Sequence, residues 1–377
     1  MIVSPCEIGP TVVDLIMDCI PVTLLTGFLG SGKSTLLTQI LTEPGFGDTA
    51  VVVNEFGEVG LDGFLVEHAD DQIVEMTSGC LCCTIRGDIR ETLLALYGRR
   101  DKGEIRAFRR LIVESTGLAD PAPVIHTLMS DPSLERRYML GGIVATIDAI
   151  NGADTLDAHV ECVKQVAVAD RLVITKTDLV EEFAVCRGVT QLIAKLRTLN
   201  PSAPILERHG LEFDLGRLFD TSLYDPETKT IDVRKWLNAE AEQDVTDHHD
   251  HAHHHHDHSH YPGQDPHDVT RHGTDIRSFV LTFDKPLPAE AFCSALEALT
   301  RTQGANLLRL KGVVDTVERP GHPLVIHGVQ HVFHDPIYLE AWPDADDRTR
   351  LVFVTRHIER DTLERYFETW IGAEQAF

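Results

Sequence analysis

The clearest chemistry in this sequence belongs to residues 27–34, which read GFLGSGKS and are followed by a threonine. This is the pattern G-x-x-x-x-G-K-[ST], whose glycines let the backbone turn tightly, so that its N–H groups converge on phosphate oxygens. The lysine reaches the β- and γ-phosphates, and the following serine hydroxyl ligates Mg²⁺. A strand-like run precedes the pattern and a helical run follows it, so we expect the positive end of that helix to face the phosphates. The predicted nucleotide-binding residues are Gly27, Gly30, Ser31, Gly32, Lys33, Ser34 and Thr35, with Lys33 also catalytic and Ser34 also a metal ligand.

A second group is the cysteine run GCLCC at residues 79–83. The three thiols of Cys80, Cys82 and Cys83 could converge on one soft ion, with a fourth position left for another ligand or a client protein. On extended backbone Cys80 and Cys82 would project to one side, and we expect a turn at 82–83 to bring in the third thiol. Redox thiols and a buried cluster are the alternatives. Upstream, Glu55 and Glu58 lie in NEFGEVGLD, where a switch loop should be, and could ligate Mg²⁺ or the transferred metal. A solvated turn is the alternative for this segment.

The segment ESTG at residues 114–117 ends another apolar run. An acid at the end of a strand beside the phosphate-loop strand can hold the hydration shell of Mg²⁺, which makes Glu114 a predicted catalytic residue. Gly117 could present its N–H to the γ-phosphate, so that the next loop would respond to hydrolysis. The alternative is a core strand that ends in a turn. No residue identifies itself as the general base.

The run TKTD at residues 175–178 also follows a strand-like segment. It resembles the N-K-x-D guanine motif, with Thr175 in place of asparagine. The carboxylate of Asp178 could accept hydrogen bonds from the N1–H and the exocyclic amine of guanine, a pair that adenine does not supply, and Lys176 would lie along the base plane. These residues therefore favour GTP over ATP. A polar turn and an ATP-dependent kinase or transferase are the alternatives.

A tract at residues 247–260 reads DHHDHAHHHHDHSH and holds nine of the 20 histidines. Neutral imidazoles bind Zn²⁺, Ni²⁺, Co²⁺ and Cu²⁺, so the tract is predicted to be a metal reservoir that feeds the cysteine site. A polar linker of biased composition is the alternative. Four further histidines, His322, His327, His331 and His334, have no diagnostic spacing and are predicted to be structural.

Composition limits the partners and the compartment. The 377 residues include 34 Lys+Arg and 59 Asp+Glu, a formal charge of −25, which disfavours nucleic acid and anionic membranes and attracts cations. Eight cysteines, three of them clustered, indicate metal or redox chemistry in a reducing compartment. Residues 1–20 lack Lys and Arg, unlike a secretory signal, and no apolar run approaches the ~20 residues of a membrane span. We therefore expect a soluble, cytoplasmic protein.

The elements that must position these groups alternate along the chain. Short apolar runs separated by helical stretches predict an α/β doubly wound, mostly parallel sheet, followed by a smaller α+β domain. The predicted units are an N-terminal extension (1–20), a phosphate-loop domain (21–237), a polar, histidine-rich flexible linker (238–275) and the C-terminal domain (276–377). The predicted strands are Val22–Thr26, Ala50–Asn54, Gln72–Met76, Arg110–Glu114, Gly142–Ile147, Arg171–Thr175 and Pro204–Glu207, then Phe279–Phe283, Leu307–Val313, Leu324–His327 and Leu351–Val354. The predicted helices include Lys33–Leu41, Ile89–Tyr97, Val189–Leu199, Ala289–Thr302 and Asp361–Trp370.

Taken together, these motifs resemble the CobW family of P-loop GTPases, from Pro21 to Trp370. The resemblance rests on TGFLGSGKST, NEFGEVGLD, GCLCC, ESTGLADP, TIDA (146–149) and TKTD. It implies a slow GTPase that acts as a metallochaperone, delivering zinc, cobalt or iron to client enzymes. It implies that the cysteine trio is the family's C-x-C-C metal motif. It also implies that the C-terminal domain contacts the client or controls homodimer formation.

The resulting hypothesis is a switch in which GTP and Mg²⁺ close the segments 55–62 and 79–83 around a metal, and hydrolysis releases that metal to a client. Thiolates and a histidine tract favour Zn²⁺, with Co²⁺ second. The alternatives are a metal storage or buffer protein that uses the histidine tract, and a cobalt chaperone for cobalamin-type metabolism.

Overall fold

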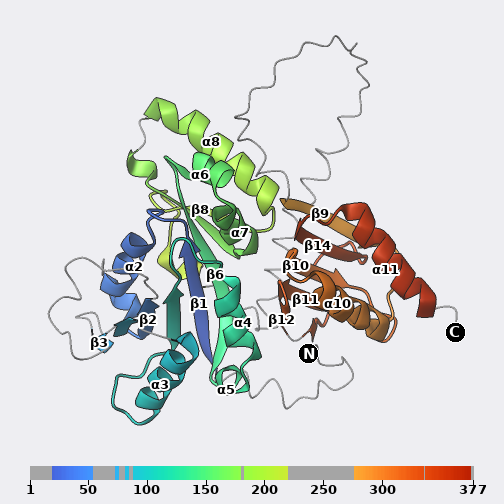
Figure 1. The fold of residues 1–377 in the computed structure, drawn as a ribbon, viewed down its shortest axis with the longest axis horizontal. Coiled ribbons are helices and arrows are strands. Elements are labelled where there is room, and N and C mark those ends of the chain that lie inside the picture. The colour runs from blue at the N-terminus through green and yellow to red at the C-terminus, as the bar shows by residue number, and fades with distance from the viewer. Residues whose placement is uncertain are drawn as a thin grey trace.

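The computed structural model describes residues 19–53, 73–75, 81–84, 88–179, 182–219, 276–334 and 336–374. These residues form two sheets, each with its own helices (Figure 1). The Glu55 and Glu58 positions, Cys80 and the histidine tract at 247–260 lie outside the described residues. Within the described part, no helix combines the length and the apolar character that crossing a membrane requires.

The first sheet has eight strands in the order β3-β4-β2-β5-β1-β6-β7-β8. All neighbours pair in parallel except β3 and β4, which are antiparallel. Parallel strands end at one edge of the sheet, so the segments that follow β1, β5, β6 and β7 meet there. The strands are β1 (Ile20–Gly27), β2 (Thr49–Val53), β3 (Ile73–Glu75), β4 (Leu81–Thr84), β5 (Arg110–Glu114), β6 (Tyr138–Asp148), β7 (Arg171–Thr175) and β8 (Ile205–Glu207).

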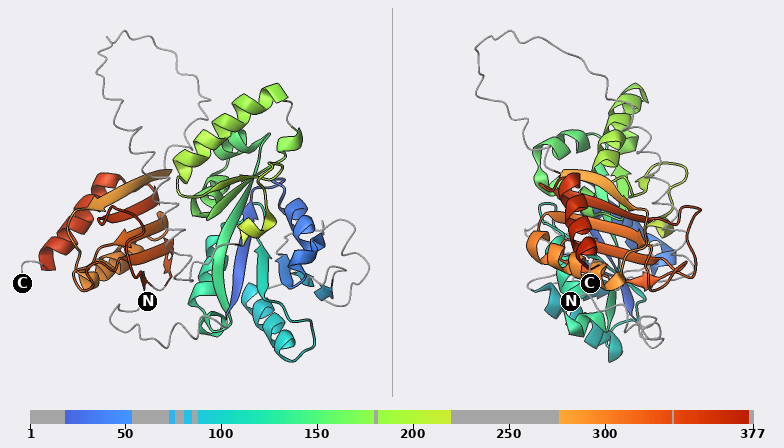
Figure 2. Two further views of the ribbon diagram at one scale, coloured as in Figure 1. Left: turned by 180° about the vertical axis from the view of Figure 1, so that it is seen from behind. Right: turned by 90° about the vertical axis from the view of Figure 1, so that its right-hand side faces the viewer.

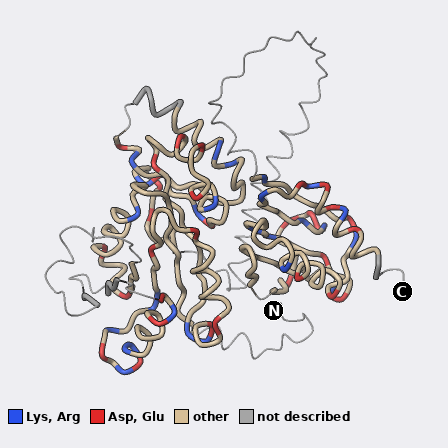
Figure 3. Tube along the Cα trace, in the orientation of Figure 1, with Lys and Arg blue, Asp and Glu red and all other residues tan. Residues whose placement is uncertain are grey.

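Helices cover both faces of this sheet, which is why its strands are apolar on both sides. Alternate residues of β2 show the division: Ala50 and Val52 pack into one core, and Val51 and Val53 into the other. The first core lies under α3 (Ile89–Asp101), α4 (Ala122–Ser130), α5 (Pro132–Glu135), α6 (Gly152–Ala158), α7 (Val160–Val168) and α8 (Glu182–Leu199). The second lies under α2 (Lys33–Thr42) and the short 3₁₀ turns η2 (Pro44–Phe46) and η4 (Leu215–Leu218). A further 3₁₀ turn, η3 (Thr177–Leu179), follows β7. Charged residues gather on the helices and loops, and the central strands carry few (Figure 3).

The second sheet is antiparallel, in the order β12-β11-β10-β14-β9 with β13 beside β11. Two helices, α10 (Ala289–Gln303) and α11 (Arg360–Glu374), pack on one face over a core that includes Phe292, Phe353 and Phe367. Helix α11 lies on the side of this sheet that faces away from the first domain (Figure 2). The strands are β9 (Ile276–Phe283), β10 (Leu307–Val314), β11 (Leu324–Val329), β12 (Val332–Phe333), β13 (Ile337–Tyr338) and β14 (Thr349–Arg356).

The second sheet packs against the helices of the first domain rather than against its sheet (Figures 1 and 2). Its residues Leu308, Val329 and Val354 join the core formed by α4, α7 and α8. The two domains therefore share one apolar contact.

The predicted fold class, a doubly wound, mostly parallel sheet followed by a smaller α+β domain, is confirmed. The strands Arg110–Glu114 and Arg171–Thr175 match β5 and β7 residue for residue. The turn predicted at Cys82–Cys83 is wrong, because both residues lie inside β4, which is paired with β2 on one side and β3 on the other. Strand β4 and helices α4 to α7 had not been predicted.

Candidate functional site

The phosphate-binding pattern forms a tight loop between β1 and α2. Gly27, Gly30 and Gly32 have φ angles of 138°, 70° and 91°, which residues with a Cβ rarely adopt. At Gly27 space is also lacking, because a Cβ there would lie 2.4 Å from Thr146 Oγ1. The glycines predicted from the motif are therefore required by the geometry of this loop.

Residues at or just after the ends of β5, β6 and β7 contact the phosphate loop. After β5, Gly117 lies so close that a Cβ on it would be 2.6 Å from Leu29 N. From β6, the Thr146 hydroxyl shares a 2.7 Å hydrogen bond with the Ser31 hydroxyl. From β7, Thr175 Oγ1 donates to Ser31 O at 2.7 Å. The loop is thus fixed by side chains as well as by its own backbone.

The side chain of Lys33, the cation of the loop, is buried within the loop. Lys33 is 8% exposed, and its Nζ donates to Gly27 O at 2.8 Å and to Phe28 O at 3.1 Å. It is the first residue of α2, whose N-terminal N–H groups receive no side-chain cap and whose first turn has no acidic residue. An uncapped helix N-terminus beside an ammonium group is a site for an anion.

Oxygen donors lie beside this loop. Glu114 ends β5 and is 3% exposed, and Ser34 is exposed in the first turn of α2. Across the sheet the backbone of Glu114 is in register with Leu25 of β1, two residues before the loop begins. A hydroxyl and a carboxylate are donors that suit Mg²⁺.

The segment predicted to read the base follows β7. Lys176 has a φ of 59°, a left-handed conformation that non-glycine residues seldom adopt. Its Nζ contacts Asp148 Oδ2 at 2.7 Å. Burial opposes ionisation of Asp148, but hydrogen bonds from Lys176, the Ile150 N–H and Asn151 hold its pKa below the usual range. Asp148 therefore remains charged and fixes Lys176 against the end of β6.

Asp178 lies in η3 with its carboxylate half exposed. Its Oδ1 is 3.0 Å from His209 Nε2, and His209 comes from the segment after β8. The acid predicted to read the base therefore lies beside a second loop at the same edge of the sheet as the phosphate loop.

The cysteine-bearing strand lies at this edge as well. Thr84 of β4 is in register with Val53 of β2, and Val53 with Glu114 of β5. Adjacent strands are about 4.8 Å apart, so the backbone that follows Cys83 lies about 10 Å from that of Glu114. For Cys82 and Cys83 the structure describes the backbone alone. Among the described side chains, no group of three or more His, Cys, Asp or Glu is arranged to hold a metal ion.

Two cysteines outside the cysteine run, Cys162 and Cys293, are buried free thiols. Burial raises the pKa of Cys162 to about 12, and burial with the nearby Glu318 carboxylate raises that of Cys293 to about 11. Such thiols stay protonated and poorly reactive. His327 and His334 are likewise buried and stacked at 4.9 Å between ring centroids, in line with the structural role predicted for them.

Several residues around the loop had not been assigned a role from the sequence. Thr146 and Asp148 belong to the TIDA run, which had been noted without a function. Gln165 of α7 is 1% exposed, and its Nε2 donates to Gly117 O and Ala119 O, each at 3.1 Å. The signal for TIDA was its place at the end of an apolar run, as for the other motifs. Gln165 gave no signal, because its partners lie 46 and 48 residues away.

Comparison with protein families matches both domains. The model described as the CobW/HypB/UreG nucleotide-binding domain matches residues 21–207. The model described as the cobalamin synthesis protein cobW C-terminal domain matches residues 276–371.

Individual relatives align over most of their length. The zinc chaperone YjiA of Escherichia coli is 32% identical over 93% of this chain and 98% of its own. The zinc-regulated GTPase metalloprotein activator 1 of Schizosaccharomyces pombe is 27% identical over 92% of this chain and 85% of its own. The crystal structure of Zn(II)-bound YjiA GTPase from E. coli aligns with a TM-score of 0.68 and 30% identity, covering 94% of this chain and 99% of that one.

Proposed function

The chain belongs to the CobW family, and from this premise we propose that it is a GTP-hydrolysing zinc metallochaperone. GTP would bind at residues 27–35, and its hydrolysis would control the release of a metal held by the cysteine trio. The names of the relatives support zinc as the metal and GTP as the nucleotide. We propose the unit boundaries 21–237, 238–275 and 276–377 for the GTPase domain, the linker and the C-terminal domain.

The phosphate loop carries this proposal. Three glycines with left-handed φ angles, a buried Lys33 hydrogen-bonded to loop carbonyls and an uncapped helix start form a cradle for phosphate oxygens. The phosphate oxygens would replace the loop carbonyls as acceptors for the Lys33 ammonium group. Gly27, Gly30, Ser31, Gly32, Ser34, Thr35 and Gly117 are the proposed phosphate contacts.

Mg²⁺ fits the oxygen donors beside the loop. Ser34 would contribute its hydroxyl, and Glu114 would hold the hydration shell through its buried carboxylate. The ion would supply charge neutralisation at the phosphates. Lys33 and Glu114 are the proposed catalytic residues, and we expect slow turnover, because the sequence identifies no residue as a general base.

Guanine selection is assigned to the segment after β7. Asp178 would accept the two hydrogen bonds that guanine donates, with Lys176 along the base plane and Thr175 joining the segment to the phosphate loop. The His209 contact supports this role, because it holds the Asp178 carboxylate beside the segment after β8. A nucleotide there would span from the ends of β7 and β8 to the start of α2.

The metal site is proposed at Cys80, Cys82 and Cys83, with Glu55 and Glu58 as further ligands. The register of β4, β2 and β5 supports coupling, because it sets the backbone of the cysteine strand two strands from Glu114. A change at the phosphates would have to travel only about 10 Å to reach that strand. Cobalt is the alternative cargo.

The partner is proposed to be a client metalloprotein, contacted through the C-terminal domain. That domain could also support a homodimer. Neither nucleic acid nor a membrane is proposed as a partner, because the formal charge is −25.

The test is metal analysis of the full chain purified without a metal-affinity column. We expect one tightly held zinc ion that disappears in a variant with all three cysteines replaced by serine, and GTP hydrolysis that exceeds ATP hydrolysis. Loss of most metal on deletion of residues 247–260, with the tight site unaffected by the cysteine replacement, would instead favour a storage protein.

A further inference from the structure

Helix α7 contacts the nucleotide edge of the first domain through its N-cap residue and its second turn. The His159 ring, at its N-cap, stacks on Phe28 of the phosphate loop with 4.4 Å between ring centroids. Six residues further on, in the second turn of the helix, Gln165 donates to the carbonyls of Gly117 and Ala119. Beside it, Lys164 Nζ lies 2.8 Å from Asp120 Oδ2. Residues 117–120 are thus tied to one helix by three polar contacts, one of them fully buried.

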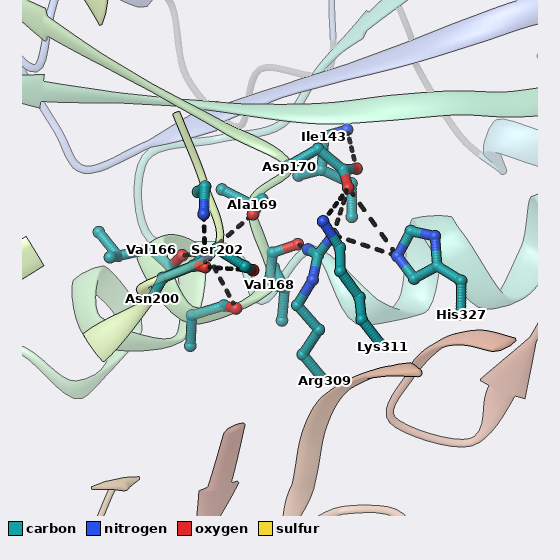
Figure 4. A network of polar contacts seen from close by, with 12 residues as sticks. Ile143, Val166, Val168, Ala169, Asp170, Asn200, Ser202, Arg309, Lys311 and His327 are labelled. Carbon is teal, nitrogen blue, oxygen red and sulfur yellow. Dashed lines mark hydrogen bonds and ion pairs between the residues drawn. The ribbon is translucent and has the colours of Figure 1, made fainter. Parts of the chain in front are cut away.

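The far end of the same helix contacts the second domain. The last carbonyls of a helix lack partners within it and need donors from elsewhere. Asn200, which is fully buried, donates to Val166 O and Ala169 O, both at 2.8 Å. Val168 O instead accepts from Arg309 Nη1, and Arg309 comes from β10 of the second sheet (Figure 4).

Arg309 also contacts Asp170, two residues past the end of α7 (Figure 4). Both side chains are buried, and Asp170 Oδ2 accepts from the Ile143 N–H of β6 at 2.9 Å. Around them Lys311 Nζ and His327 Nε2 lie 3.8 Å from Asp170 Oδ1, and Arg309 Nη2 lies 3.1 Å from His327 Nε2. Burial disfavours the charged form of Asp170, but the Arg309, His327 and Lys311 charges outweigh it and hold its pKa well below the usual range.

The second domain therefore completes the C-terminal cap of α7. A guanidinium at a helix C-terminus also meets the negative end of the helix dipole. The body of α7 leaves little room for independent motion, because Cys162, Val163 and Val166 are buried in the core. A packed helix of nine residues shifts as one piece, by the 1–2 Å typical of helix displacements at interfaces.

We propose that α7 connects the nucleotide site to the C-terminal domain, with Gln165 positioning residues 117–120 from the second turn of the helix and Arg309 holding the second domain at its C-terminal end. The proposal rests on the proposed function, because it takes residues 117–120 as the loop that responds to the γ-phosphate. It goes beyond that function by making the placement of the C-terminal domain dependent on the bound nucleotide.

Reciprocity of linkage supplies the test: if nucleotide state moves the domain, a change at the domain contact alters the preference between GTP and GDP. The measured quantity is the ratio of the Kd values for GDP and a non-hydrolysable GTP analogue, obtained by fluorescence titration of the full chain. Gln165→Met keeps the length and removes the donors. Arg309→Lys keeps a cation beside Asp170 but loses the planar fork that spans Val168 O and the carboxylate.

We expect each single variant to change the ratio about 5-fold or more, and the double variant to change it no more than the larger single variant. The proposal would be overturned if the change of the Kd ratio in the double variant equalled the product of the two single changes. It would also be overturned if the Kd ratio of Arg309→Lys equalled that of the wild type. Lys195→Met is the matched control, because the hydrogen bonds of Lys195 to Ala153 O and to Asp157 join α8 to α6, and its ratio should equal wild type.

Two further outcomes are separated by the same titrations. If Arg309→Lys lacks a cooperative unfolding transition, Lys311→Met, which removes another cation beside Asp170, takes its place with the same expected and contradicting results. If the wild-type chain binds neither nucleotide, the proposed function fails and this inference with it. If the wild-type chain binds nucleotide but the two single changes of the Kd ratio multiply in the double variant, only this inference is overturned.

Discussion

Two buried cations in this protein hold main-chain carbonyl oxygens, one in the phosphate loop and one between the domains. Lys33 donates to Gly27 O and Phe28 O, neutral groups of its own loop. Arg309 donates to Val168 O and to the charged carboxylate of Asp170, both of which belong to the first domain. The Lys33 contacts are local and replaceable, whereas those of Arg309 join segments 139 and 141 residues apart.

This difference separates a binding site from a structural connection. A cation whose hydrogen bonds go to loop carbonyls at an uncapped helix start can exchange them for phosphate oxygens. A guanidinium that joins a buried carboxylate and a helix C-terminus is fixed as long as the fold lasts. Replacing Lys33 should therefore affect turnover more than stability, and replacing Arg309 the reverse.

The largest effect is expected for Arg309→Met. Removing one partner of a buried ion pair leaves Asp170 charged and desolvated, which costs about 3–5 kcal/mol of unfolding free energy. Urea unfolding of the full chain, with the slope m unchanged, measures this cost. A loss below about 1 kcal/mol, the range of an exposed ion pair, would contradict the assigned role of Arg309.

Lys33→Ala should lower kcat/KM for GTP by about 10²–10³-fold, the usual effect of deleting one preorganised electrostatic contact to a reacting group. Its unfolding free energy should fall by only about 1 kcal/mol, because the lost hydrogen bonds are to carbonyls within one loop. Steady-state phosphate release and urea unfolding give the two values. If Lys33→Ala kept its turnover and lost much of its unfolding free energy, Lys33 would have a structural role like that of Arg309, and the account would be wrong.

The domain contact should also weaken in mild acid. Burial lowers the pKa of His334 from 6.5 to about 4, against the opposing charge of Asp170. Because the unfolded chain then binds a proton more readily than the folded one, stability falls as the pH drops from 6.5 to about 4, by about 3 kcal/mol in all. In His334→Gln this part of the pH dependence should vanish. The measurement is urea unfolding at several pH values between 4 and 6.5. His126→Gln, an exposed change on α4, should keep the wild-type slope of unfolding free energy against pH. The same slope in both variants would exclude His334 as the source of this pH dependence.

A smaller effect is expected at Asp178, which is proposed to bind the guanine base. Asp178→Asn should weaken GTP binding about 10- to 100-fold, as loss of a charge-assisted hydrogen bond costs roughly 1.5–3 kcal/mol, and should shift preference toward xanthine nucleotides. Competition between GTP and XTP measures the shift. Asp154→Asn, an exposed change on α6, is the control. Unaltered selectivity would point to an adenine or non-specific site.

Much of the nucleotide edge could be predicted from sequence because its determinants are local. Strands β5 and β7 are buried on both faces, so they appear as continuous apolar runs with sharp ends. The motifs follow those runs directly, and parallel pairing brings them to one edge. The glycines of the loop were predictable because their φ angles exclude other residues.

The interdomain contact could not be predicted in the same way. Arg309 lies in the strand LLRLKGVV, where an arginine would ordinarily indicate a solvent-facing position, yet it is 1% exposed. Its partners are far away in sequence, and no local pattern encodes them. Strand β4 was missed for a related reason: its cysteines indicated metal chemistry, and the backbone pairing with β2 and β3 depends on distant segments.

The most direct test of the proposed switch is the zinc affinity of the full chain with GDP and with a non-hydrolysable GTP analogue, measured by competition with a chelator. The account predicts tighter zinc binding with the analogue, by about 5-fold or more, and no difference between nucleotides in Lys33→Ala. Equal zinc affinity in the two nucleotide states of the wild-type chain would contradict it.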